Sequence, residues 1–74
     1  MSVVLHSRDN CVQCAASKRL LKKLSITYTE VDLDKDEEAL ERVKSWGFQA
    51  APVIDADGDR WSGYNPDKIR GLVE

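Results

Sequence analysis

The chain has 74 residues, a formal net charge of −2 at pH 7, 42% apolar residues and 32% charged residues. This balance is typical of a globular protein, and so small a charge does not indicate a nucleic-acid partner. No apolar run approaches the roughly 20 residues that a membrane-spanning helix needs, and the N-terminus lacks the basic and apolar segments of a signal peptide. We therefore expect a single cytoplasmic domain, residues 1–74, with no membrane contact.

The first half of the chain predicts a strand, a helix and a second strand. The run Val3–Leu5 is apolar and rich in β-branched residues, as in a central strand buried on both faces. From Val12 to Leu24 the pattern is helical, and its apolar positions are Val12, Ala16, Leu20, Leu21 and Leu24. Ile26–Leu33 alternates between its two sides, which predicts a half-exposed strand.

A second helix is expected to follow directly. Asp34 stands three residues before Glu37, a spacing typical of a capping box at a helix N-terminus. Gly47 is placed to end this helix. The predicted apolar face consists of Ala39, Leu40, Val43 and Trp46.

The remainder predicts a β-hairpin and a last helix. Pro52–Ile54 forms a third strand, Asp57-Gly58 is a strong hairpin-turn signal, and Asp59–Ser62 turns back as a fourth strand. Asn65 and Pro66 then cap and open a helix. The residues expected to face the core from that helix are Ile69, Leu72 and Val73.

The predicted order is therefore β-α-β-α-β-β-α. Strands joined through a helix are normally parallel, whereas a two-residue turn joins antiparallel strands. The fold class is α/β, with one four-stranded mixed sheet and three helices.

The two cysteines, Cys11 and Cys14, open the first predicted helix. Such a pair can be half of a metal site, a structural bridge or a dithiol that exchanges electrons. A bridge across so short a loop removes little entropy from the unfolded chain, and small disulfide-stabilised domains usually have more cysteines. Structural zinc needs four ligands, whereas this chain adds only His6, which we expect to be packed or half exposed in the first strand. The redox dithiol is favoured, without a metal, and zinc shared between two chains is left as an alternative.

Their positions make the two cysteines unequal. A redox cysteine reacts as the thiolate, which the unpaired N–H groups and dipole of a helix N-terminus stabilise. Cys11 lies at that terminus and is expected to attack, whereas Cys14 lies one turn further in and is expected to resolve the mixed disulfide. Arg8 and Asp9 have opposite effects on the charge near Cys11, and their sum is not assigned.

Three segments together carry a family resemblance: Cys11-Val12-Gln13-Cys14, Gln49-Ala50-Ala51-Pro52-Val53 and Trp61-Ser62-Gly63-Tyr64-Asn65-Pro66-Asp67. A C-x-x-C motif at the first helix of a β-α-β unit is typical of thioredoxin-like proteins. The chain resembles a protein of glutaredoxin size in that superfamily, and more narrowly the NrdH-redoxins, electron donors of class Ib ribonucleotide reductase. This resemblance implies a thioredoxin/glutaredoxin-like fold and thiol–disulfide oxidoreductase activity.

The resemblance also implies roles for particular residues. Pro52 is expected to follow a cis peptide bond and to face the dithiol, and Ala51 to offer its backbone to the extended chain of a partner. The implied partner-binding residues are Val12, Gln13, Ala51, Pro52, Trp61, Ser62, Gly63 and Tyr64. For Trp61, a purely structural place in the core is the competing interpretation.

The same resemblance suggests which reductase supplies the electrons. Glutathione-binding members typically have a glycine pair and a polar residue where this chain has Trp61–Pro66, and Pro66 lacks an N–H donor. Weak or no glutathione binding and reduction by thioredoxin reductase are therefore implied. The expected client is the large subunit of class Ib ribonucleotide reductase, and the expected state is a monomer without a cofactor other than the dithiol. A glutathione-dependent glutaredoxin and a non-catalytic, metal-binding module are the alternatives.

Overall fold

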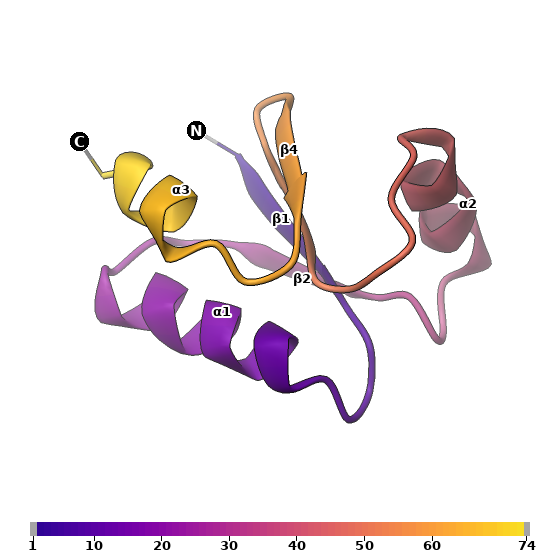
Figure 1. Ribbon diagram of the computed structural model, residues 1–74, viewed down its shortest axis with the longest axis horizontal. Coiled ribbons are helices and arrows are strands. Elements are labelled where there is room, and N and C mark those ends of the chain that lie inside the picture. Colours follow the sequence, from indigo (N-terminus) through magenta and orange to yellow (C-terminus); the bar gives the residue numbers. More distant parts are fainter. Residues whose placement is uncertain (1, 74) are drawn as a thin grey trace.

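The computed structural model describes residues 2–73, and its elements follow the predicted order (Figure 1). The strands are β1 (Val3–Ser7), β2 (Thr29–Asp32), β3 (Val53–Ala56) and β4 (Asp59–Ser62), and the helices are α1 (Val12–Lys23), α2 (Glu37–Ser45) and α3 (Pro66–Gly71). The sheet order is β2-β1-β3-β4, with β1 parallel to β2 and the other neighbours antiparallel. The α/β fold class, the mixed sheet and the central place of β1 are confirmed.

The sheet separates two apolar clusters. Helices α1 and α3 lie on one side of the sheet and α2 on the other (Figure 1). The cluster under α1 and α3 contains Val3, Leu5, Leu20, Leu21, Ile54, Ala56, Trp61 and Ile69, and the cluster under α2 contains Leu33, Ala39, Val43 and Val53. Leu5 and Ile54 face each other across β1 and β3, and both are fully buried. Burying a side chain of that size contributes about 1.5–3 kcal/mol.

The buried side of α1 differs from the predicted one. Val12 is 81% exposed, whereas Cys14 and Ser17 are buried. In a helix of 3.6 residues per turn, side chains four residues apart differ by about 40° in direction around the axis. This difference adds up along the predicted apolar face, so Val12 and Leu24 cannot lie on the same side of the helix. Ser17 occupies its buried position without an unpaired hydroxyl, because its Oγ donates to the Gln13 carbonyl at 2.9 Å.

The predicted cap of α2 was wrong. Asp36, not Asp34, precedes the helix, and its Oδ1 accepts a hydrogen bond from the Ala39 N–H at 3.0 Å. Asp34 lies in a turn in which the Lys35 and Asp36 N–H groups both donate to the Asp32 carbonyl. That turn delays the start of the helix, so Glu37 becomes its first residue rather than its third.

Two strand starts and one predicted core residue need correction. Strand β2 begins at Thr29 instead of Ile26, because the Ile26 N–H still donates to the Leu21 carbonyl at the end of α1. Strand β3 begins one residue after Pro52. Val73 is 53% exposed, because α3 ends at Gly71 and the chain has left the helix before it. The hairpin turn and the Asn65 cap of α3 are confirmed, with positive φ at both Asp57 and Gly58, as a type I′ turn requires.

Candidate active site

Cys11 is the N-cap residue of α1. Its backbone is extended (φ −109°, ψ 106°), and its Sγ accepts a hydrogen bond from the Cys14 N–H at 3.1 Å. The first turn of α1 has no acidic residue, and its last turn contains Lys22 and Lys23, which complement the helix dipole. After reduction, the sulfur of Cys11 is therefore placed where backbone N–H groups favour a thiolate.

Cys11 and Cys14 are joined by a disulfide, with their Cα atoms 5.2 Å apart. Cys14 is 1% exposed, whereas Cys11 is only partly buried. A protein disulfide can therefore reach the sulfur of Cys11 but not that of Cys14. This difference agrees with the positions expected for the attacking and the resolving cysteine.

The loop before β3 lies against Cys11. The Ala51–Pro52 peptide bond is cis, as the resemblance implied. The carbonyl oxygen of Ala51 lies 3.8 Å from the Cys11 Sγ, and the Pro52 side chain is fully buried. Ala51 therefore offers backbone groups next to the reactive sulfur, whereas Pro52 acts by shaping the loop and not through its own surface.

The segment Ser62–Tyr64 is hydrogen-bonded both to the loop before β3 and to α1. The Ser62 Oγ donates to the Ala50 carbonyl at 2.7 Å, and the Gly63 N–H donates to the Pro52 carbonyl at 2.8 Å. The Tyr64 N–H donates to the Gln13 Oε1 at 3.0 Å. Gly63 has a φ of +88°, and a Cβ atom there would lie 3.3 Å from the Gln13 Oε1.

The expected partner-binding residues thus fall into two groups. Val12 (81% exposed) and Tyr64 (41% exposed) present side chains to solvent, and Gln13 and Ser62 are also exposed. Trp61 is 5% exposed and packs in the cluster under α1 and α3, with the Lys68 ammonium 5.4 Å from its ring centroid. Trp61 therefore occupies the structural position named as the competing interpretation and offers a partner almost no surface.

Asp34 anchors the loop that precedes Cys11. Its Oδ1 lies 3.3 Å from the Arg8 Nη1, and its Oδ2 accepts a hydrogen bond from the Asp9 N–H at 3.1 Å. Carboxylate oxygens of Asp9, Asp32 and Asp34 lie within 4.8 Å of one another at the surface. The charge of Arg8 is thus partly compensated by the Asp34 carboxylate from the turn after β2. The sequence interpretation had used Asp34 as a helix cap and missed this contact.

Comparison with known proteins places the chain among relatives of the same size. The family model for glutaredoxin matches residues 3–61. The glutaredoxin-like protein NrdH of Lactococcus lactis subsp. cremoris is 37% identical over 71 residues, which are 96% of this chain and 99% of the relative. The chain belongs to the glutaredoxin family. The NrdH protein of Salmonella typhimurium is 36% identical over 97% of this chain and 89% of its own length.

A solved structure supports the narrower assignment to the NrdH group. The NrdH-redoxin of Escherichia coli superimposes with a TM-score of 0.95 at 35% identity, covering 97% of this chain and 95% of the other. This redoxin therefore has the thioredoxin/glutaredoxin fold, and its C-x-x-C pair makes it a thiol–disulfide oxidoreductase. None of the helices within residues 2–73 is both long enough and apolar enough to span a membrane.

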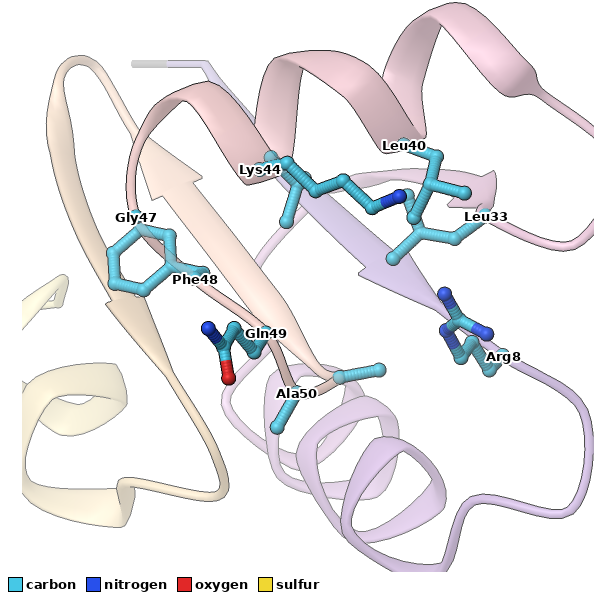
Figure 2. A pocket seen from close by; sticks show the side chains of 10 residues that line it. Arg8, Leu33, Leu40, Lys44, Gly47, Phe48, Gln49 and Ala50 are labelled. Carbon is cyan, nitrogen blue, oxygen red and sulfur yellow. The ribbon is translucent and has the colours of Figure 1, made fainter.

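A pocket of about 420 Å³ opens beside the redox centre, on the side of α2 (Figure 2). We call it the α2 pocket; it is lined by Leu33, Leu40, Val43, Arg8, Lys44 and the segment 47–51. The sequence interpretation had assigned Leu40 and Val43 to the core and had given no role to Lys44 or Phe48. The apolar periodicity of α2 identifies its inner face but does not tell how much of that face the sheet covers.

Proposed function

We propose that this redoxin carries electrons from thioredoxin reductase to the large subunit of class Ib ribonucleotide reductase. It would act as a cytoplasmic monomer whose only redox group is the Cys11–Cys14 dithiol. The NrdH name of the relatives supports this client, and the E. coli structure is described as explaining a thioredoxin-like activity profile. The proposal extends both to this chain.

Two thiol–disulfide exchanges account for the reaction. The Cys11 thiolate attacks one sulfur of the client disulfide, forms a mixed disulfide and releases one client cysteine as a thiolate. The Cys14 thiolate then attacks the Cys11 sulfur, releases the second client cysteine and forms the Cys11–Cys14 disulfide. The client gains two electrons and two protons, and thioredoxin reductase returns the same number to the redoxin.

The observation that carries the choice of reductase is the N-terminus of α3, where a glutathione carboxylate would need free N–H donors. The Tyr64 N–H donates to Gln13, and the Lys68 N–H donates to the Asn65 side chain. Pro66 has no N–H, and Asp67 adds a negative charge in the first turn. These contacts disfavour glutathione, which supports thioredoxin reductase as the electron source.

The test compares the two reducing systems with one client. NADPH oxidation is followed with either thioredoxin reductase or glutathione plus glutathione reductase, and insulin serves as the disulfide substrate. We expect turnover with thioredoxin reductase and only background with glutathione. Robust glutathione-coupled turnover would instead identify a glutathione-dependent glutaredoxin. For the client, the Cys14→Ser variant is incubated with cell extract, and the large subunit is expected among the trapped mixed disulfides.

A further inference from the structure

The α2 pocket adjoins the redox centre at Ala51 and Arg8. Ala51 lines the pocket, and its carbonyl oxygen lies 3.8 Å from the Cys11 Sγ. Arg8, which lines the pocket as well, belongs to the loop that leads into Cys11. A polypeptide whose disulfide reaches Cys11 and whose backbone lies along Ala51 therefore has its neighbouring residues at the mouth of this pocket.

The lining of the pocket combines an apolar floor with two cations. Leu33 and Val43 are almost fully buried and Leu40 and Phe48 partly so. Figure 2 shows the Lys44 side chain lying along α2 with its nitrogen toward Leu33 and Leu40. The Arg8 guanidinium lies at this same end of the pocket. Within residues 2–73, no carboxylate is among the lining residues, although the whole chain has a net charge of −2.

Both cations take part in ion pairs at the surface. Arg8 has one contact with Asp34 at 3.3 Å, and Lys44 lies 4.0 Å from Glu41. The side chains in these pairs are between 36% and 77% exposed, and ion pairs so exposed to solvent contribute little to stability. A carboxylate brought into the pocket can therefore replace Glu41 at Lys44, whereas Arg8 stays partly compensated by Asp34, which has Asp9 and Asp32 close to it.

We propose that the α2 pocket binds an apolar side chain and an adjacent carboxylate of the client polypeptide, both close in sequence to its reactive cysteine. The inference rests on the proposed reduction of a protein disulfide and adds the sequence context that the redoxin prefers. The apolar side chain packs on Leu40 beside Leu33, and the carboxylate pairs with Lys44, whose nitrogen lies at the same place (Figure 2). In an extended chain alternate side chains share one face, so residues near the cysteine can enter the pocket while the backbone stays along Ala51.

The probe is a set of synthetic peptides in which one cysteine carries a mixed disulfide with 2-mercaptoethanol. The peptides differ only in two residues beside the cysteine, which are leucine or serine and glutamate or lysine. The rate of reduction by the fully reduced redoxin is measured by quenching and chromatography. We expect the leucine–glutamate peptide to react about fivefold faster than the leucine–lysine peptide, and replacing leucine by serine to slow the reaction further.

Variants of exposed lysines identify the pocket as the origin of this preference. Lys44→Glu is expected to reverse the order of the glutamate and lysine peptides. Lys23→Glu is the matched control, because it changes the net charge equally from the far end of α1. Reduction of 2-hydroxyethyl disulfide, which is neutral and has no flanking residues, is expected to be the same in all three proteins.

The outcomes separate the inference from the proposed function. Equal rates for all peptides, or equal changes in Lys44→Glu and Lys23→Glu, overturn the inference and leave protein-disulfide reduction intact. If 2-hydroxyethyl disulfide is reduced but no peptide is, the proposed function fails as well. If Lys44→Glu slows only reduction by thioredoxin reductase, the pocket binds the reductase, and the client assignment is wrong.

Discussion

Toward α3, the surroundings of Cys11 are held by hydrogen bonds, whereas toward α2 they form an open pocket. On the α3 side, Ser62, Gly63 and Tyr64 are bonded to Ala50, Pro52 and Gln13. On the α2 side, the cations of the pocket, Arg8 and Lys44, take part in exposed ion pairs. The hydrogen bonds on the α3 side hold the backbone near the Cys11 sulfur in place. The ion pair of Lys44 on the α2 side can be replaced by a contact with a partner. One side of Cys11 therefore determines the shape of the site, and the other side determines which partners it prefers.

Replacing either cysteine has the largest expected effect, because the two cysteines form the redox pair that both sides surround. Cys11→Ser should reduce turnover to the uncatalysed background and form no mixed disulfide with a client. Cys14→Ser should also lose turnover but should accumulate the mixed disulfide, since the resolving thiolate is missing. Mass spectrometry of the acid-quenched, non-reduced proteins distinguishes the two. Accumulation in Cys11→Ser instead would mean that the buried sulfur of Cys14 attacks the client disulfide.

The substitution Gly63→Ala should disrupt the hydrogen-bonded backbone on the α3 side. Alanine at a φ of +88° is strained, and its Cβ would press on the Gln13 Oε1 at 3.3 Å. We expect a loss of about 1–2 kcal/mol in the free energy of unfolding, measured by urea denaturation, and slower reduction of protein disulfides. Gly71→Ala is the matched control, because nothing lies within 4 Å of a Cβ there and no positive φ is involved. Equal losses in the two variants would contradict a special constraint at Gly63.

A smaller effect is expected from the single hydrogen bond that joins the α3 side to α1. Gln13→Ala removes the acceptor of the Tyr64 N–H, which costs about 0.5–1 kcal/mol at an exposed position. Gln13→Glu retains an acceptor oxygen and is the control. Amide hydrogen exchange of Tyr64, followed by NMR, should accelerate in Gln13→Ala and stay slow in Gln13→Glu. Unchanged protection in Gln13→Ala would show that other contacts hold the segment.

The sequence predicted the closed α3 side better than the open α2 side. The element order, the hairpin turn and the Asn65 cap depend on local patterns, and all were predicted. The cis Ala51–Pro52 bond was predicted only through the family resemblance. A proline in the sequence is not enough to predict it, because most peptide bonds before proline are trans. Local chemistry therefore determines much of the backbone that surrounds Cys11.

The pocket and its charges depend on contacts between distant segments. Asp34 and Asp36 are both good caps, and only the turn after β2 decides that Asp36 caps α2 while Asp34 binds Arg8. Lys44 looks like an ordinary solvated residue until α2 is placed beside the segment 47–51. Trp61 likewise became a core residue only because β4 directs its ring into the cluster under α1 and α3. Such outcomes follow from tertiary packing, which residue spacing does not encode.

The smallest expected effect comes from Glu30, which lies on neither side of Cys11. Its carboxylate accepts hydrogen bonds from the Lys18 ammonium at 3.0 Å and the Ser7 hydroxyl at 2.8 Å, and these contacts, the first above all, lower the pKa of Glu30. The resulting stabilisation is present above the pKa of the unfolded chain, about 4.3, and is lost as the pH falls through the lower folded value. Because the Glu30 and Lys18 side chains are 41% and 34% exposed, Glu30→Gln should cost only a few tenths of a kcal/mol at pH 7.

Urea denaturation of Glu30→Gln and the unaltered protein at pH 7 and pH 3 tests the sign of this effect. The difference in unfolding free energy should shrink toward pH 3, where the carboxylate of the unaltered protein becomes protonated. Protein-disulfide turnover at pH 7 should be unchanged, because Glu30 joins β2 to Ser7 and Lys18 and contacts neither the segment Ser62–Tyr64 nor the α2 pocket. A large loss of turnover in this variant would mean that the charge of Glu30 acts on the dithiol directly. The α3 side and the α2 side would then not account for all the surroundings that control Cys11.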